Sequence, residues 1–294
     1  MILPVPYTAK EEDLLSPGIR QGFFPPGATQ SEAMLCAGMS RLAYCRKDAE
    51  FAFDQARIRE NLQSIGFAPY RFLESANTSH GKGAHCLIVV RDDPQPSRKL
   101  AVVVFRGTDV KDVSNLLYDA DLQLGAWIGK GRVHKGFAAA LGQVQQDALA
   151  ALNALPEYRL LYTGHSLGAA MATLLACLNK PAALYTFGSP RVGDATFVSS
   201  LQGVANHRFQ DCCDLVARVP PEELGYRHVG QPHYIDRKRC VIMNPDERFV
   251  SKDHGRARWR FLLRYAWRPG NVRVRDLADH APMNYVWPVA AMPY

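Results

Sequence analysis

Residues 163–170 read TGHSLGAA, in which Ser166 stands two residues from a glycine on each side. A short apolar run, 158–163, precedes the motif, and an alanine- and leucine-rich segment, 167–178, follows it. A G-x-S-x-G sequence between a strand and a helix is typical of a nucleophile elbow, whose strained turn points a serine hydroxyl out above the sheet edge. The pentapeptide alone also fits a glycine-flanked helix N-cap. In its strand-helix context it predicts that Ser166 is a nucleophile.

A nucleophilic serine needs a histidine base and a carboxylate, which in α/β-hydrolases follow in the order Ser, Asp or Glu, His. Asp214, in QDCCDLVARVPP, comes after an apolar run and before a Pro-Pro loop. A loop in that position can aim a carboxylate at an imidazole. The residues around Asp194 are typical of a helix N-cap, and Asp211 lies inside the expected strand. We therefore expect Asp214 to be the acid.

Two histidines compete for the role of base. The five that follow Ser166 are at positions 207, 228, 233, 254 and 280. His207 leaves little room for a preceding acid at a strand end. His254 lies in a charged, turn-like stretch that favours a solvated side chain, whereas His280 opens an apolar segment that can pack around an imidazole. We expect His280 to be the base.

The elements that must position these residues alternate between strand and helix. Apolar runs predict strands at 84–90, 100–105, 158–163, 182–187 and 207–216, and helical periodicity predicts helices from Ser31, at 136–154 and at 167–178. Such alternation predicts an α/β fold with a largely parallel sheet covered by helices on both faces. Residues 1–30, rich in proline and glycine, are expected to form an irregular arm, and 31–294 a single domain, because no linker interrupts the alternation.

Composition excludes several classes of protein. The 294 residues are 47% hydrophobic with a net charge of +7, which is ordinary for a globular chain. Apolar runs are too short to cross a bilayer, and the start lacks the pattern of a secretory signal. The seven cysteines show no metal-ligand spacing, and their odd number favours buried thiols in a reducing compartment. We expect a soluble protein, cytoplasmic by default, with export that needs no signal still open.

Taken together, the sequence resembles the fungal-type (class 3) lipase family of α/β-hydrolases. Six blocks carry the resemblance: VVVFRGTD (102–109), VHKGF (133–137), TGHSLGAA (163–170), TFGSPRVGD (186–194), DLVARVPP (214–221) and DHAPMNY (279–285). It implies a mostly parallel central sheet with an antiparallel start, helices on both faces, and hydrolysis of carboxylic esters without a cofactor. The family's catalytic residues fall on Ser166, Asp214 and His280, in agreement with the reading of the residues alone.

The resemblance also implies an oxyanion hole and a lid. Thr108 matches the family's side-chain oxyanion donor, which would act with the backbone N–H of Leu167. The segment 109–132 matches the lid, in which Leu116, Leu117, Tyr118, Trp127 and Ile128 could form an apolar cover. A packed loop with no gating role fits this segment equally well.

The resemblance leaves the substrate and the partners of the protein open. A lipase or esterase acting on acylglycerols or related lipid esters is the first reading. Phospholipase A-type or short-chain esterase activity, or a non-catalytic lipid- or partner-binding module with the hydrolase fold, are the alternatives. The oligomeric state cannot be read from the sequence.

One basic segment does not follow from the resemblance. Residues 254–270 read HGRARWRFLLRYAWRPG. Four arginines recur there every four residues, at 256, 260, 264 and 268, and the apolar residues are Trp259, Leu262, Leu263, Ala266 and Trp267. Such a helix could rest on an anionic membrane surface, although an ordinary surface helix with its apolar stripe in the core is the favoured interpretation. Nucleic-acid binding is not expected, because no binding motif accompanies the charge.

Overall fold

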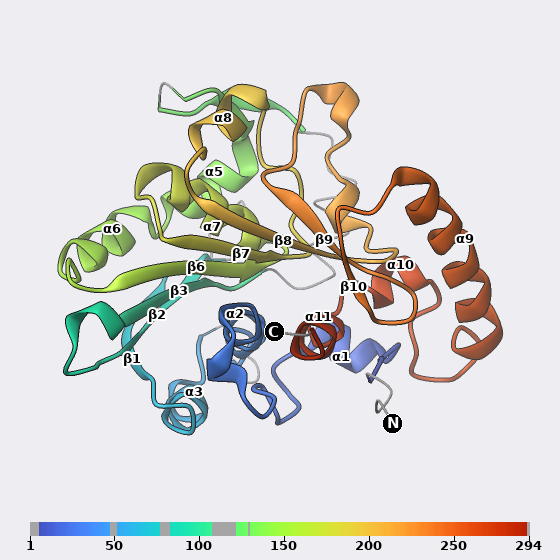
Figure 1. Ribbon diagram of the computed structural model, residues 1–294, viewed down its shortest axis with the longest axis horizontal. Helices are drawn as coiled ribbons and strands as arrows, with labels where there is room; N and C mark the ends of the chain where they lie inside the picture. Colours follow the sequence, from blue (N-terminus) through green and yellow to red (C-terminus); the bar gives the residue numbers. More distant parts are fainter. Residues whose placement is uncertain (1–5, 48–51, 77–82, 108–121, 129, 293–294) are drawn as a thin grey trace.

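A computed structural model describes residues 6–47, 52–76, 83–107, 122–128 and 130–292. An eight-stranded sheet runs through the centre of the molecule (Figure 1). Its strands are β1 (Ala68–Glu74), β2 (His85–Arg91), β3 (Leu100–Phe105), β6 (Arg159–His165), β7 (Ala183–Phe187), β8 (Ala205–Asp211), β9 (Gln231–Ile235) and β10 (Val241–Met243). The strands β4 (Leu124–Ala126) and β5 (Arg132–His134) form a separate antiparallel pair.

The sheet is mostly parallel. In space its strands follow the order β1-β2-β3-β6-β7-β8-β9-β10. Neighbouring strands from β3 to β9 pair in parallel. β2 pairs antiparallel with both β1 and β3. This arrangement confirms the expected mostly parallel sheet with an antiparallel start. A second antiparallel pair, β9 with β10, closes the other edge, which the sequence did not reveal.

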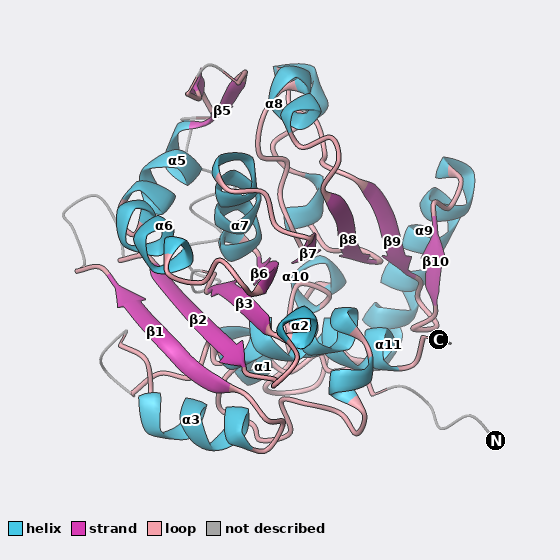
Figure 2. Ribbon diagram, turned by 60° about the vertical axis from the view of Figure 1, so that its left-hand side comes forward, coloured by secondary structure: helices cyan, strands magenta, loops and turns pink. Residues whose placement is uncertain are grey.

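Helices cover both faces of the sheet. One face carries α5 (Lys135–Gly142), α6 (Gln145–Asn153), α7 (Leu167–Leu178) and α8 (Ala195–Ser200). The other carries α1 (Glu11–Leu15), α2 (Glu32–Leu42), α3 (Gln55–Gln63) and α11 (Met283–Ala290). Beyond the β10 edge lies α9 (Glu247–Arg264), and α10 (Arg275–Ala278) packs against it. Figure 2 shows the same layers after a turn of the molecule.

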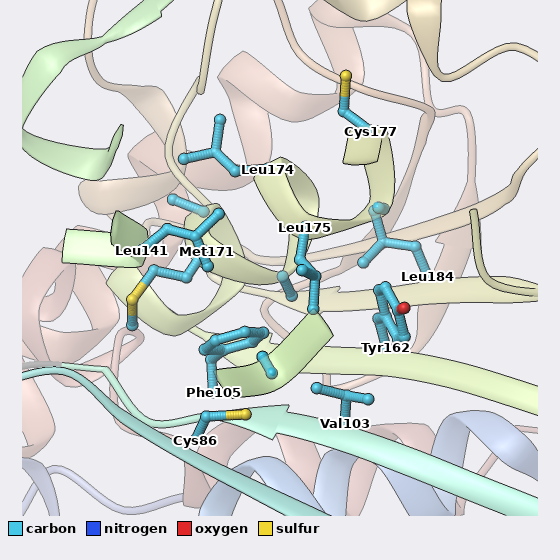
Figure 3. Packing of buried hydrophobic residues seen from close by; sticks show 14 of the residues in the cluster. Cys86, Val103, Phe105, Leu141, Tyr162, Met171, Leu174, Leu175, Cys177 and Leu184 are labelled. Carbon is cyan, nitrogen blue, oxygen red and sulfur yellow. The ribbon is translucent and has the colours of Figure 1, made fainter. Parts of the chain in front are cut away.

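Strand alternation divides the core into two apolar clusters, because successive side chains of a strand point to opposite faces. In β3, Val103 and Phe105 pack beneath α7 and α5, whereas Val102 and Val104 pack on the α2 side. Figure 3 shows the first cluster, in which Phe105 and Tyr162 from the strands meet Met171 and Leu175 of α7. Residues of β3 are therefore buried throughout, as the continuous apolar run 100–105 predicts.

The helix predicted over 136–154 is wrong in one respect, since it is two helices. The chain leaves α5 at Gly142 and re-enters helical geometry after Val144, whose backbone angles are φ −129° and ψ 0°. Apolar residues continue in helical phase across this break, since Leu141, Val144 and Ala148 are all buried in one cluster. Periodicity alone therefore could not reveal it.

The bounds of other predicted elements differ less from those in the structure. The strand expected at 207–216 ends at Asp211, where a turn begins. Within the first 30 residues, the helix α1 and a 3₁₀ turn at Ala28–Gln30 interrupt chain without regular structure. Over the described ranges, every helix is too short or too polar to span a membrane.

Candidate active site

The turn between β6 and α7 has the geometry of a nucleophile elbow. Ser166 stands between the two elements with φ 59° and ψ −129°, a left-handed conformation that is strained for a residue with a side chain. Two glycines allow the tight passage. A Cβ at Gly164 would lie 2.4 Å from the carbonyl carbon of Gly168, and one at Gly168 would lie 2.2 Å from the carbonyl oxygen of Phe105.

Three side chains that are distant in sequence meet at this turn. Ser166 Oγ lies 3.0 Å from His280 Nε2. On its other side, His280 Nδ1 lies 3.0 Å and 2.9 Å from the two carboxylate oxygens of Asp214. Asp214 follows the end of β8, and His280 follows α10. The structure therefore brings together the nucleophile, base and acid that the sequence predicts, at hydrogen-bond distances suited to proton transfer.

The rival residues occupy other positions. Asp211 forms an ion pair with Arg239, whose Nη1 lies 2.7 Å from both carboxylate oxygens. Asp194 caps α8 by accepting a hydrogen bond from the backbone N–H of Phe197. His254 lies within α9, half-buried beside Tyr234, so the solvated turn expected for it is wrong.

The exposure of the nucleophile corrects another expectation. We expected the Ser166 hydroxyl to point out above the sheet edge, yet Ser166 is 0% exposed. His280 and Asp214 are buried as well. The Ser166 hydroxyl is therefore closed to solvent in this structure.

Tyr285 is a site residue that the sequence reasoning missed as such. Its hydroxyl donates a hydrogen bond to Asp214 and accepts one from the backbone N–H of Asp211 at 3.1 Å. The backbone N–H of Val216 also donates to Asp214, at 2.8 Å. Burial by itself raises the pKa of Asp214, but His280 and the hydrogen bonds from His280 and Tyr285 outweigh it, so that the pKa lies below its ordinary value.

His165 and Gly188 also support the site. Burial, and then the neighbouring His280, hold the pKa of His165 well below its ordinary value. The neutral ring donates from Nε2 to the carbonyl oxygen of His280 at 2.8 Å and accepts at Nδ1 from the Tyr44 hydroxyl at 2.8 Å. Gly188 has φ 58°, and a Cβ there would lie 2.7 Å from Asp214 Oδ2. The sequence signal that could have indicated Gly188 is its place directly after a buried strand, in TFGSP.

Of the predicted oxyanion donors, only Leu167 is described. It is the first residue of α7, where helix N–H groups lack partners within the helix and the dipole is positive. Thr108 lies outside the described residues, as do Leu116, Leu117 and Tyr118 of the predicted lid. Trp127 is buried and the adjacent Ile128 exposed, and a gating role for this segment stays a prediction.

One buried cluster has the residue types of a metal site. Cys212, Cys213 and Asp279 place their sulfur and carboxylate atoms within 4.8 Å of one another. The carboxylate is already engaged, because Asp279 Oδ2 accepts hydrogen bonds from Arg275 Nε at 2.9 Å and from the backbone N–H of Cys213 at 2.8 Å. A hydrogen bond with Cys213, followed by burial, raises the pKa of Cys212. A protonated thiol is a poor metal ligand, so we assign no metal here.

Comparison with known proteins agrees with this geometry. Residues 102–224 match the family model "Lipase (class 3)". Over 115 residues the chain is 42% identical to "Secreted mono- and diacylglycerol lipase 1" of Fusarium solani, covering 35% of this chain and 34% of that protein. Over 165 residues it is 32% identical to "Lipase" of Rhizomucor miehei, covering 50% and 44%. The chain thus spans less than half the length of these curated relatives.

Solved structures share the fold. The lipase of Rhizopus microsporus var. chinensis matches with a TM-score of 0.60 and 22% identity, over 95% of both chains. The native propeptide complex of Rhizomucor miehei lipase matches with a TM-score of 0.57 and 24% identity, over 80% of this chain and 75% of that one. The fold and the strand-turn-helix serine define an α/β-hydrolase. Within that class, residues 102–224 match the class 3 lipase family.

Proposed function

We propose that this protein is a serine carboxylic ester hydrolase that cleaves acylglycerols or related lipid esters. One observation carries the proposal: Ser166 Oγ lies 3.0 Å from His280 Nε2, while Asp214 lies 2.9 Å from Nδ1 of the same ring. This is the relay that a serine needs in order to attack an acyl carbonyl. The class 3 family model and the lipase names of the relatives support the ester as substrate.

The reaction follows from the roles of the three side chains. His280 accepts the proton of Ser166 as its oxygen attacks the ester carbonyl, and then donates that proton to the departing alcohol. Asp214, held ionised by its hydrogen bonds, orients the imidazole and stabilises its cationic form. Water then releases the fatty acid from the acyl-enzyme by the same steps in reverse order.

The negative oxygen of each tetrahedral intermediate needs hydrogen-bond donors. We assign this role to the backbone N–H of Leu167, at the N-terminus of α7, and, from the resemblance, to Thr108. A donor of this kind typically contributes about 3 kcal/mol to the stability of the transition state. No cofactor takes part in these steps.

Hydrolysis of a soluble ester tests the proposal. We expect wild-type protein to cleave p-nitrophenyl butyrate, and Ser166→Ala to lose at least about a thousandfold in kcat, because removal of a triad serine leaves only binding and oxyanion stabilisation. His280→Ala should be as damaging, while His254→Ala, on α9, should retain activity. Equal rates for the wild type and Ser166→Ala would reject the hydrolase and favour a binding module.

The burial of Ser166 suggests which ester class is preferred. A covered nucleophile suits a substrate whose surface displaces the cover, so we expect activity to rise when an acyl ester exceeds its solubility. The measurement is a series of p-nitrophenyl esters of increasing chain length, below and above the solubility of each. A rate that saturates below solubility, with no further rise above it, would identify a short-chain esterase instead.

We also propose a reducing, cytoplasmic location. All seven cysteines are unpaired, and six of them are buried, which is the state that a reducing compartment maintains. Secretion is named only for relatives such as the Fusarium protein. Cell fractionation tests the location, and recovery of the protein in the culture medium would overturn it.

A further inference from the structure

The outer face of α9 exposes large apolar side chains. Ten such side chains are exposed across the described ranges, and five belong to α9 and the turn after it: Phe249, Trp259, Leu262, Leu263 and Trp267. Trp259 and Trp267 are each 64% exposed and Leu263 is 63% exposed. The interpretation that buried this stripe in the core is therefore wrong. Figure 1 shows that α9 lies at the periphery of the molecule.

The inner face of α9 is held firmly by other contacts. Asp253 accepts hydrogen bonds from the Tyr234 hydroxyl at 3.1 Å and from the backbone N–H of Arg237 at 2.8 Å. Ala257 and Phe261 are buried. These contacts settle which side of the helix faces the protein, so the exposed apolar face is a fixed feature of the fold.

A row of arginines runs beside the apolar row. Trp259, Leu263 and Trp267 repeat every four residues, and so do the exposed arginines at positions 256, 260, 264 and 268. Within α9 the two rows lie roughly 100° apart around the helix, because each arginine is one residue from the apolar row. Trp267 and Arg268 lie in the turn that follows Arg264. None of these four arginines pairs with a carboxylate within the described part of the chain. Arg258, on the inner side, differs in that it pairs with Asp276.

We propose that this face of α9 and the turn after it, within residues 249–268, docks the protein on an anionic lipid surface. Apolar and aromatic side chains enter the boundary between headgroups and acyl chains, where tryptophan is favoured. Arginines extend their stems along that boundary and place their guanidinium groups among the phosphates. A nucleic acid would pair with the arginines but would leave Leu262 and Leu263 uncovered. Delivery of substrate to the site rests on the proposed function, whereas docking itself needs no turnover.

The docking face is attached to the elements that carry the candidate base and acid. Arg258 of α9 forms an ion pair with Asp276 of α10, four residues before His280. The thiol of Cys213, next to Asp214, donates a long hydrogen bond to the backbone carbonyl of His254. A surface that binds α9 therefore contacts a helix that packs directly on both loops of the site.

Vesicle binding by an inactive protein tests the docking face. In the Ser166→Ala background, we expect co-sedimentation with vesicles that contain phosphatidylglycerol, weaker binding to pure phosphatidylcholine, and a decrease as salt screens the charges. Each arginine near an anionic surface is worth about fivefold in binding. The change Arg260→Glu with Arg264→Glu should therefore lower the partition coefficient at least about tenfold. Trp259→Gln with Leu263→Gln should lower it too, since both rows take part.

Matched controls separate the face from general charge and apolarity. Arg59→Glu with Arg71→Glu makes the same change of charge at exposed residues of α3 and β1, far from α9 in Figure 1, and should leave binding nearly unchanged. Ile19→Gln is the apolar control, because Ile19 is 53% exposed elsewhere. Equal losses in test and control variants would overturn the docking face, as would binding to double-stranded DNA that survives Trp259→Gln with Leu263→Gln while vesicles are ignored.

Activity on dissolved p-nitrophenyl butyrate distinguishes the two proposals. The α9 variants should keep the wild-type rate on this ester, because none of the changed residues touches the Ser-His-Asp site. A protein that hydrolyses the ester but does not bind vesicles would overturn only the proposed docking face. A protein that binds vesicles but hydrolyses nothing would remove the proposed hydrolase alone.

Discussion

At the scale of single residues, hydrogen bonds keep the carboxylate of Asp214 ionised although it is fully buried. An unpaired buried carboxylate would take up a proton, but Tyr285, His280 and the Val216 backbone each supply a donor. Tyr285 in turn is fixed by the backbone N–H of Asp211. In the proposed reaction, Tyr285 therefore acts through Asp214, as a positioning residue.

Tyr285→Phe tests this role. We expect kcat on a soluble ester to fall about tenfold, because loss of a hydrogen bond to a charged group costs about 1.5–3 kcal/mol. The pKa of Asp214 should rise, moving the acid limb of the pH–rate profile to higher pH. Tyr162→Phe is the control, because its hydroxyl is also held by one side chain, Asn179, but away from the site. An unshifted acid limb in Tyr285→Phe would show that the tyrosine only fills space.

At the scale of elements, close backbone packing decides where Ser166 lies. The first turn of α7 lies against the ends of β3 and β6, and no side chain fits at Gly164 or Gly168. Small residues at the start of α7 allow this approach, since Ala169 and Ala170 are fully buried. The requirement for glycine here is therefore one of space.

A pair of glycine substitutions tests that requirement. Gly168→Ala should lower the free energy of unfolding by about 1–3 kcal/mol, because the new Cβ would meet the Phe105 carbonyl at 2.2 Å. Gly255→Ala, within α9 and with no atom within 4 Å, should raise it by about 0.5–1 kcal/mol through helix propensity. Urea unfolding monitored by circular dichroism measures both. A Gly168→Ala protein as stable as the wild type would mean that the elbow tolerates a wider separation.

At the scale of the whole molecule, buried histidines couple stability to pH. The pKa values of five histidines, at positions 165, 207, 228, 233 and 254, are lowered, in each case first by burial. The pKa of His233 falls to about 4. In the unfolded chain these groups return to about 6.5. Below that pH the unfolded chain therefore binds protons that the folded protein excludes.

The free energy of unfolding should therefore fall as the pH drops from about 7.5 to about 5.5. The slope is about 1.4 kcal/mol per pH unit for each proton taken up on unfolding. Urea titrations across this range measure it. His228→Gln should make the slope shallower, since it removes one excluded proton while an amide can still donate to the Ala217 carbonyl that His228 binds. A free energy of unfolding that stays constant across this pH range would contradict the exclusion of protons from the folded protein.

Much of the fold could be predicted from the sequence because it is encoded locally. The run 100–105, the glycine-flanked Ser166 and the helix from Leu167 each depend on neighbours in the chain, and the structure has all three. The choice of Asp214 and His280 followed from chain order and flanking residues, and these two side chains do meet Ser166. Their catalytic roles, like the single domain over 31–294, remain predictions.

Only the tertiary structure decided what lies around these residues. Tyr285 and Gly188 reach Asp214 from distant segments, and no local pattern records such a contact. The burial of Ser166 and the exposure of Trp259 both depend on how distant segments of the chain pack together. Helical periodicity shows that a helix has two faces, but which face is buried depends on the surface that the rest of the chain presents to it.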